Sequence, residues 1–356
     1  MEVGALMSGA RSRPAASPFP AMLSTSANPV QRNFDFASRT PLASAAWVVR
    51  EEAIMGTSVR VELWAADRRA GELAAGAVMD EMHRIDRAMS PHKAGSELCR
   101  INREAARRPV PLSDEMFNLI SRALDFSRLT EGAFDISYAA VGALYDYRER
   151  VRPTEQALQA ARACVGWQQL QLDGRARTLR FAREGMRIDL GGFAKGHAVD
   201  RAVTLLARRG VRHAYVSAGG DSRVLGDRRG RPWSVAIRHP RRPGELVAVL
   251  PLEDVSVSTS GDYERCFEVD GERVHHLIDP ATGKSASAVR SVTILAADGL
   301  SSEALSKAVF VMGAQRGLEL VESLSGVDAV IVDAQGLLHA SSGLLQGLPA
   351  VGLAAE

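Results

Sequence analysis

Apolar residues recur along this chain with two periods, which predict helices and strands. Residues 58–64 alternate apolar and polar positions and predict a strand, whereas residues 70–89 carry apolar side chains three or four positions apart and predict an amphipathic helix. Ser113, followed by two acidic residues, is typical of a helix start, and this helix is expected to run to about Leu129. The same patterns predict further helices at 194–209, 302–313 and 318–324, and further strands at 170–172, 178–181, 186–190, 214–217, 233–237, 247–250, 255–258, 291–296 and 329–332.

The order of these elements predicts an α+β fold, because helices and strands are mixed without the regular alternation of a doubly wound sheet. Ordered structure is expected to begin near Trp47. Residues 1–45 are rich in Ala, Ser, Pro and Arg and have little periodicity, so we interpret them as a disordered or processed leader. Residues 46–350 are then expected to form one domain.

The composition narrows the class of protein. Hydrophobic residues make up 46% of the chain and charged residues 24%, which is typical of a globular protein with a sizeable core. A net charge of +2 argues against a general electrostatic binder of nucleic acid, which needs a clustered basic excess. No apolar run reaches the roughly 18 residues that a transmembrane segment requires. The spacing of Cys99, Cys164 and Cys266 fits neither a zinc site nor a small disulfide framework.

A first candidate site lies at 189–197, where a predicted strand runs through two glycines into a helix. Glycines at such a junction let backbone N–H groups approach an anion, and the helix start adds partial positive charge. Lys195 would add a point charge for phosphate. The alternative is an ordinary tight turn with a surface lysine.

A second candidate lies at 275–283, which begins with two histidines and continues through Asp279-Pro280. A histidine can accept a proton from an attacking hydroxyl near neutral pH, and Asp279 could orient it or bind a ligand. The alternative is a turn made by Asp-Pro and Thr-Gly, with the histidines ending a strand. Residues 217–221 and 258–263 also place small polar groups at strand ends, where either a ligand or an ordinary turn would account for them.

A fourth candidate is the pair Glu303 and Lys307, four residues apart on a predicted helix. Glu preceding Lys by four positions is the favourable orientation for a helical ion pair, which contributes only a few tenths of a kcal/mol. A surface ion pair is therefore the default interpretation of these two residues.

Taken together and in order, these segments resemble one family, the ApbE-like FAD:protein FMN transferases. The resemblance covers about residues 47–345. The matching motifs are Met55–Thr57, Ser96–Leu98 with Asn102, Gly132–Asp135, Asp189–Gly196, Ala218–Asp221, Ser258–Tyr263, His276–Gly283 and Glu303–Gly313.

The resemblance implies a single T-fold-like α+β domain with FAD in a cleft. It implies transfer of the FMN half of FAD to a Thr or Ser hydroxyl of an acceptor protein, with AMP leaving. His276 matches the proposed general base, and His92 falls where the family commonly has an aromatic residue. Residues that match flavin-dinucleotide contacts are Met55, Ala133, Phe134, Asp135, Asp189 and Leu277.

One departure from the family concerns Mg²⁺. The family binds this ion through an Asp, a Thr four residues later and a backbone carbonyl at the position of Gly192, whereas this chain has Glu303 and Lys307. Glu can still be a ligand, but a protonated Lys has no lone pair to donate. Either Lys307 replaces the cation, anchored by Glu303, or the site is broken and the protein binds FAD without efficient transfer. An FAD pyrophosphatase is a third alternative.

The compartment stays open at this stage. Prolines at 14, 18 and 20 interrupt any apolar stretch of a secretory signal, which favours the cytoplasm, whereas members of the family are commonly exported to the periplasm.

Overall fold

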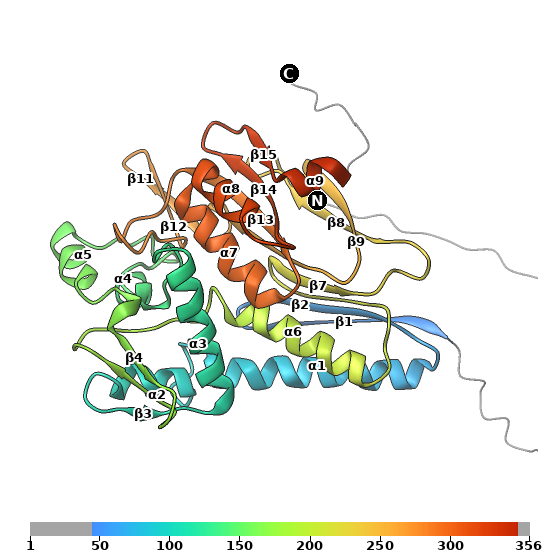
Figure 1. The fold of residues 1–356 in the computed structure, drawn as a ribbon, viewed down its shortest axis with the longest axis horizontal. Helices are drawn as coiled ribbons and strands as arrows, with labels where there is room; N and C mark the ends of the chain where they lie inside the picture. The colour runs from blue at the N-terminus through green and yellow to red at the C-terminus, as the bar shows by residue number, and fades with distance from the viewer. Residues whose placement is uncertain (1–44, 348–356) are drawn as a thin grey trace, which may run out of the picture. The chain divides into compact units, whose positions relative to one another are not determined.

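The computed structural model describes residues 45–347. Its centre is an eight-stranded sheet with the order β1-β2-β6-β7-β10-β13-β14-β15, and every neighbouring pair is antiparallel (Figure 1). The strands are β1 (Ala46–Ile54), β2 (Thr57–Ala65), β6 (Ala214–Ala218), β7 (Asp221–Leu225), β10 (Ser256–Gly261), β13 (Val289–Ala296), β14 (Asp328–Asp333) and β15 (Leu338–Ala340).

Four helices cover one face of this sheet. α1 (Arg68–Met89) packs on β1 and β2, α6 (Ala194–Arg208) on β6 and β7, α7 (Gly299–Met312) on β10 and β13, and α8 (Ala314–Glu322) on β14. The apolar stripe predicted for α1 is its buried side, because its side chains recur with the helical period. α6 packs against both α1 and α7, so its N-terminus lies in the interior of the helical layer.

The opposite face is covered in part by the hairpin of β8 (Trp233–Arg238) and β9 (Leu246–Leu252). Trp233 packs there with Val257 and Leu295 of the sheet. On β13 the neighbours of Leu295, Ile294 and Ala296, belong instead to the core beneath the helices. Successive strand residues point to opposite faces, so both faces of the central strands are buried.

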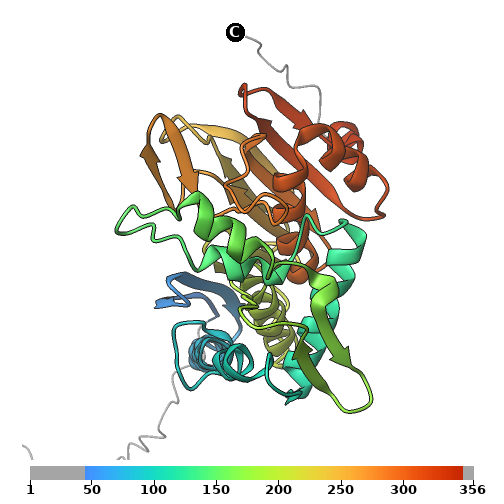
Figure 2. The ribbon, with the colours of Figure 1, turned by 90° about the vertical axis from the view of Figure 1, so that its left-hand side faces the viewer.

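The elements that lie between α1 and α6 in the sequence are grouped beside one end of these two helices (Figure 1 and Figure 2). A three-stranded sheet has the order β3-β5-β4, and β11 pairs with β12. The elements of this group are α2 (Glu97–Glu104), β3 (Val110–Pro111), α3 (Asp114–Leu129), η1 (Ile136–Tyr138), α4 (Ala139–Gly142), α5 (Glu155–Arg162), η2 (Trp167–Gln169), β4 (Leu170–Asp173) and β5 (Thr178–Phe181). Outside it lie β11 (Cys266–Val269), β12 (Glu272–His275) and, next to β14, α9 (Ser342–Gly347).

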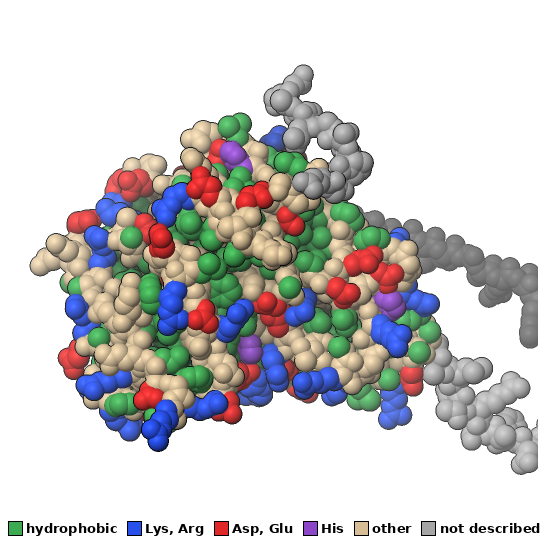
Figure 3. Space-filling model, viewed as in Figure 1, with side chains coloured by type: hydrophobic (Ala, Val, Ile, Leu, Met, Phe, Trp, Pro, Cys, Tyr) green, Lys and Arg blue, Asp and Glu red, His purple; other side chains and the backbone are tan. Residues whose placement is uncertain are grey.

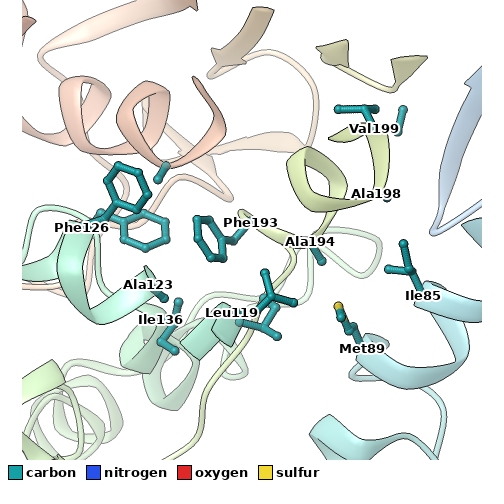
Figure 4. Close-up of a cluster of buried hydrophobic side chains, with 14 of the residues drawn as sticks. Ile85, Met89, Leu119, Ala123, Phe126, Ile136, Phe193, Ala194, Ala198 and Val199 are labelled. Carbon is teal, nitrogen blue, oxygen red and sulfur yellow. The ribbon is translucent and has the colours of Figure 1, made fainter. Parts of the chain in front are cut away.

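Phe193, just before α6, anchors this second group to the helical layer. Its ring centroid lies 6.0 Å from that of Phe126 on α3 and 5.5 Å from that of Phe134 (Figure 4). Phe193 is fully buried, and such aromatic contacts add to the free energy of burial. The turn formed by Gly191 and Gly192, which we call the glycine turn, precedes Phe193. It is therefore held at a fixed place between α3 and the helices that cover the sheet.

Acidic and basic side chains are interspersed on the face that carries α1, α3 and α6 (Figure 3). Arg84 bonds both Glu81 and Glu115, and Arg201 also bonds Glu81. Within residues 45–347, no helix combines the length and the apolar character needed to cross a bilayer.

The predicted α+β class is confirmed, and every predicted helix is present. The predicted strand at 186–190 is wrong. This segment pairs with no strand, because Asn102 occupies the N–H and C=O groups of Ile188 and the Ile136 carbonyl accepts from Asp189. The predicted leader, apart from residue 45, lies outside the described residues, and the predicted domain limits stay a prediction.

Candidate functional site

Four charged side chains meet where the first turn of α6, the start of β7 and α7 come together. They are Lys195, Asp221, Glu303 and Lys307, and we call them the charge cluster. The Glu303 side chain is 0% exposed and that of Asp221 4%, so both carboxylates lie in the interior. Buried carboxylates are costly unless paired, and the two lysines supply that pairing.

Lys195 is held by three acceptors. Its Nζ lies 2.8 Å from Asp221 Oδ2 and 3.1 Å from the Gly191 carbonyl oxygen, and it also donates to Glu303 Oε1. An ammonium has three donors, so these partners account for all of them. Burial opposes the charged form, but the two carboxylates win and raise the pKa of Lys195 above its ordinary value.

Glu303 ties the two helices together. Its Oε2 accepts the amide N–H of Gly196 at 2.6 Å, while its Oε1 faces both lysines. The default interpretation of Glu303 and Lys307 as a surface ion pair is wrong, because Glu303 is fully buried between α6 and α7. A helix spacing alone could not reveal this, since it does not say which side of the helix faces the core.

Lys307 is held more loosely than Lys195. Its Nζ lies 3.4 Å from Glu303 Oε1, 3.4 Å from Ser306 Oγ and 3.9 Å from Asp221 Oδ1. A Cβ placed on Gly192 would lie 3.5 Å from its Cε, so the lysine stem lies against the glycine turn. Lys307 thus combines a loosely bound ammonium with a position beside the anion-binding turn predicted from the sequence.

Three serines form hydrogen bonds within and beside the charge cluster. Ser258 Oγ donates to Asp221 at 2.6 Å, and both Ser258 and Ser260 bond Ser306 Oγ, at 3.0 and 2.8 Å. Sequence reasoning left the segments of Asp221 and Ser258 open between a ligand site and an ordinary turn, and it missed Ser306. The spacing carried a signal, because Ser306 follows Glu303 by three positions and so shares its helix face. Burial by itself would raise the pKa of Asp221. The charges of Lys195 and then Lys307 outweigh this effect, so the pKa of Asp221 is lowered.

Mg²⁺ does not fit this arrangement. Glu303 uses Oε2 for the Gly196 amide and directs Oε1 at two ammonium groups, which stand where a cation would approach. Among the described residues, no group of three or more His, Cys, Asp or Glu is placed to hold a metal ion. Of the expected ligand set, position 307 therefore offers an ammonium where the resemblance implies a threonine oxygen.

The segment leading into the glycine turn is fixed by side-chain hydrogen bonds. Asn102 Oδ1 accepts from the Ile188 N–H at 2.8 Å, and its Nδ2 donates to the Ile188 carbonyl at 2.9 Å. Asp189 Oδ1 then accepts from the Gly191 N–H at 2.5 Å. These bonds set the path of the chain toward Gly192 and Lys195.

The 133–135 segment follows the end of α3. The Phe134 N–H donates to Thr130 Oγ1, and its ring is buried against Phe193. Asp135 is also buried and accepts from the N–H and Oγ of Ser137 and from the Trp167 N–H. Burial raises the pKa of Asp135 despite these bonds. Ala133 is the more exposed member of this segment.

Met55 forms the turn between β1 and β2 with Gly56. The φ angles are 55° and 71°, a pattern typical of a two-residue hairpin. A positive φ is uncommon for Met, and such residues often mark functional positions. The guanidinium of Arg265 lies next to Gly56, with Nη2 3.8 Å from the position of a Cβ there.

His276 follows β12 at the entrance to the 276–283 turn. Its Nδ1 is buried and has no hydrogen-bond partner among the described residues. Burial, and then the charge of Arg265, lower the pKa of His276 to about 3, with smaller effects from Lys307 and Lys195. The imidazole is therefore neutral near pH 7, with one unprotonated ring nitrogen.

The neighbours of His276 make hydrogen bonds within the protein. His275 Nε2 bonds the Ala286 carbonyl at 2.8 Å, and Leu277 is buried with its N–H toward His275 Nδ1. Asp279 accepts from the Ala281 N–H and from Thr282, so it closes the Pro280–Gly283 turn. Asp279 therefore closes the turn predicted from Asp-Pro and Thr-Gly rather than orienting His276, and its alternative role in binding a ligand stays a prediction.

His92 stands apart from the charge cluster. It is exposed and lines a groove of about 610 Å³ together with Asn102, Met186 and Arg187, while no residue of the charge cluster lines that groove. Asn102 borders this groove and also bonds Ile188, in the segment that leads to the glycine turn beside the charge cluster.

Comparisons with known proteins place this chain and its fold in the class of flavin transferases. A curated protein of Treponema pallidum named FAD:protein FMN transferase is 33% identical over 83% of this chain and 87% of its own length. One of the same name from Salmonella typhimurium is 33% identical over 81% and 85%. The crystal structure of the ApbE protein from Thermotoga maritima aligns with a TM-score of 0.79 and 32% identity, over 85% of this chain and 99% of that one.

The profile of the ApbE family matches residues 55–331, and the chain belongs to this family. The solved flavin transferase ApbE from Vibrio cholerae has a TM-score of 0.76 and 27% identity, over 85% of this chain and 99% of its own. The matched span contains all the site residues described above, from Met55 to Lys307.

Proposed function

We propose that this protein transfers FMN from FAD to a Thr or Ser hydroxyl of an acceptor protein and releases AMP. The observation that carries the proposal is the buried imidazole of His276, whose Nδ1 has no hydrogen-bond partner among the described residues and which is neutral near pH 7. The names of the relatives support the same reaction.

The reaction breaks one bond and forms another. The acceptor oxygen attacks the phosphorus on the FMN side of the pyrophosphate, and the bond from that phosphorus to the AMP oxygen breaks. His276 accepts the hydroxyl proton as the new O–P bond forms. AMP leaves as the anion, so catalysis depends on positioning and on positive charge near the phosphates. No step in this proposal uses Mg²⁺.

We assign FAD contacts to the residues that match the family. The glycine turn beside Asp189 would face the phosphates, because backbone N–H groups and the α6 N-terminus favour anions. Lys195 would add only its positive charge nearby, because its three donors bond Gly191, Asp221 and Glu303. Met55, Ala133 and Leu277 would contact the dinucleotide through their apolar surfaces. Phe134 and Asp135 would act mainly through the backbone, since both side chains are engaged within the protein.

His92 would stack on a ring of FAD in the groove beside Asn102. An imidazole offers a smaller face than the aromatic side chain common in the family, so this contact contributes less than a phenol would. Arg187 lines the same groove and adds positive charge for an anionic ligand.

The test mixes purified protein with FAD and an acceptor protein or peptide carrying a Thr or Ser site. Covalent flavin on the acceptor together with AMP supports transfer, free FMN indicates a pyrophosphatase, and unchanged bound FAD indicates a binding protein. His276→Gln should slow transfer roughly 10²–10⁴-fold, the usual contribution of a general base, and leave FAD binding largely intact. His83→Gln, on the exposed side of α1, is the matched control. Near wild-type transfer by His276→Gln would refute the assignment.

A further inference from the structure

Resting on this proposed function, we infer that the Lys307 ammonium takes the place of a divalent cation, and that the protein binds and transfers flavin without Mg²⁺. The inference follows from the difference between two lysines in one cluster. Lys195 and Lys307 both face Asp221 and Glu303, but they are held in different ways.

Lys195 is a structural cation. Its ammonium donates to the Gly191 carbonyl and to the carboxylates of Asp221 and Glu303, so all three of its donors are used. Its position is also fixed by the next residue, because the Gly196 amide binds the same carboxylate. Lys195 balances the buried charge and has no donor left for a ligand.

Lys307 is the cation that is able to move. Its three nearest acceptors lie at 3.4, 3.4 and 3.9 Å, beyond the 2.7–2.9 Å of strong charged hydrogen bonds. Its four-carbon stem can turn the ammonium toward an anion at the glycine turn, whose Gly192 it already contacts. The Lys307 side chain is 19% exposed, so a ligand at the turn can reach it.

The charge balance of the cluster excludes an additional divalent ion. Two lysines and two buried carboxylates sum to zero. A divalent ion entering here would stand next to two ammonium groups in a medium of low dielectric, where like charges repel strongly. A pyrophosphate brings negative charge instead, and Lys307 can meet it without exposing Glu303, because Lys195 and Gly196 continue to satisfy that carboxylate.

During transfer Lys307 would face the developing negative charge. As the acceptor O–P bond forms and the bond to AMP breaks, negative charge grows on the departing phosphate oxygen. The Lys307 ammonium stabilises this charge as a divalent metal cation would, while the hydroxyl proton goes to His276. Atoms and electrons balance without another reactant.

The first experiment measures binding rather than turnover. FAD affinity, followed by flavin fluorescence, should be the same in EDTA and in added Mg²⁺, and Mn²⁺ should give no bound signal in electron paramagnetic resonance with or without FAD. Lys307→Met should weaken FAD binding about tenfold or more, because it removes one charged hydrogen bond. Lys307→Arg should recover most of the loss. Thermal melting without ligand checks that both variants fold.

The second experiment reverses the substitution. The double variant Glu303→Asp/Lys307→Thr should bind Mn²⁺ and make FAD affinity and transfer depend on the metal. Bound Mn²⁺ or Mg²⁺-dependent transfer in the wild type would overturn the inference, as would unchanged FAD affinity in Lys307→Met. If the wild type binds no FAD, the proposed function itself fails. If it binds FAD and transfers flavin only with Mg²⁺, the proposed function stands and the role of Lys307 is wrong.

Discussion

The amide nitrogen of Gly196 lies 2.6 Å from Oε2 of Glu303, so a carboxylate on α7 closes the N-terminus of α6. The two helices can approach so closely because they cross at Gly196 and Gly299, where neither residue has a side chain. The crossing brings the same carboxylate to Lys195 and Lys307. Stability and the site are therefore linked through one residue.

Replacing Glu303 by Gln keeps the shape of the side chain and removes its charge. Two ammonium groups would then share one carboxylate, Asp221, and we expect a loss of about 3–5 kcal/mol of unfolding free energy. Denaturant titration measures this loss. Glu319→Gln, on the exposed surface of α8, should stay within about 0.5 kcal/mol of the wild type. An equally small effect at Glu303 would mean that its charge is not needed for folding.

Gly196→Ala should separate α6 from α7. The new Cβ would collide with the Gly299 carbonyl, a backbone group that cannot rotate aside. Such overpacking costs about 1–3 kcal/mol or more, against a gain of about 1 kcal/mol from helix propensity. We expect lower stability and weaker FAD binding together. Gly174→Ala, whose Cβ meets only ordinary contacts, is the control, and equal melting temperatures for the two variants would contradict the prediction.

Asn102→Ala should loosen the segment before the glycine turn. It leaves the N–H and C=O of Ile188 without their partners, and each buried unsatisfied group costs about 1–3 kcal/mol. Amide hydrogen exchange should report faster exchange at 186–190, and FAD affinity should fall. Asn118→Ala, at an exposed position of α3, should change neither. Unaltered exchange in Asn102→Ala would show that packing alone fixes this segment.

His276 should make stability depend on pH. Its folded-state pKa of about 3 lies below its unfolded value of about 6.5, so between these pH values the unfolded chain binds one more proton. The contribution of the neutral histidine is complete above the unfolded pKa and declines on acidification, by up to about 1.4 kcal/mol per pH unit. The difference in unfolding free energy between wild type and His276→Gln should thus shrink from about pH 7 to about pH 5. A difference independent of pH would place the histidine pKa near its ordinary value.

Local sequence patterns were sufficient for most elements. The apolar stripe of α1 and the capping residue Ser113 of α3 depend only on neighbours along the chain, and both elements lie where they were expected. The strand predicted at 186–190 was wrong, because Met186, Ile188 and Leu190 are buried in the main core although the segment pairs with no strand. Its hydrogen bonds go to Asn102, which is 86 positions away from Ile188.

The sequence by itself determined the α+β class, the positions of the main helices and, through ordered motifs from Met55 to Gly313, the family. It also identified Glu303 and Lys307 as a departure. Only the tertiary structure decided that Glu303 is wholly buried, that Asp221 completes the charge cluster and that Lys195 rather than Lys307 is fully bonded. Helix periodicity is a property of neighbouring residues, whereas the burial and partners of a charge depend on which distant segments pack around it.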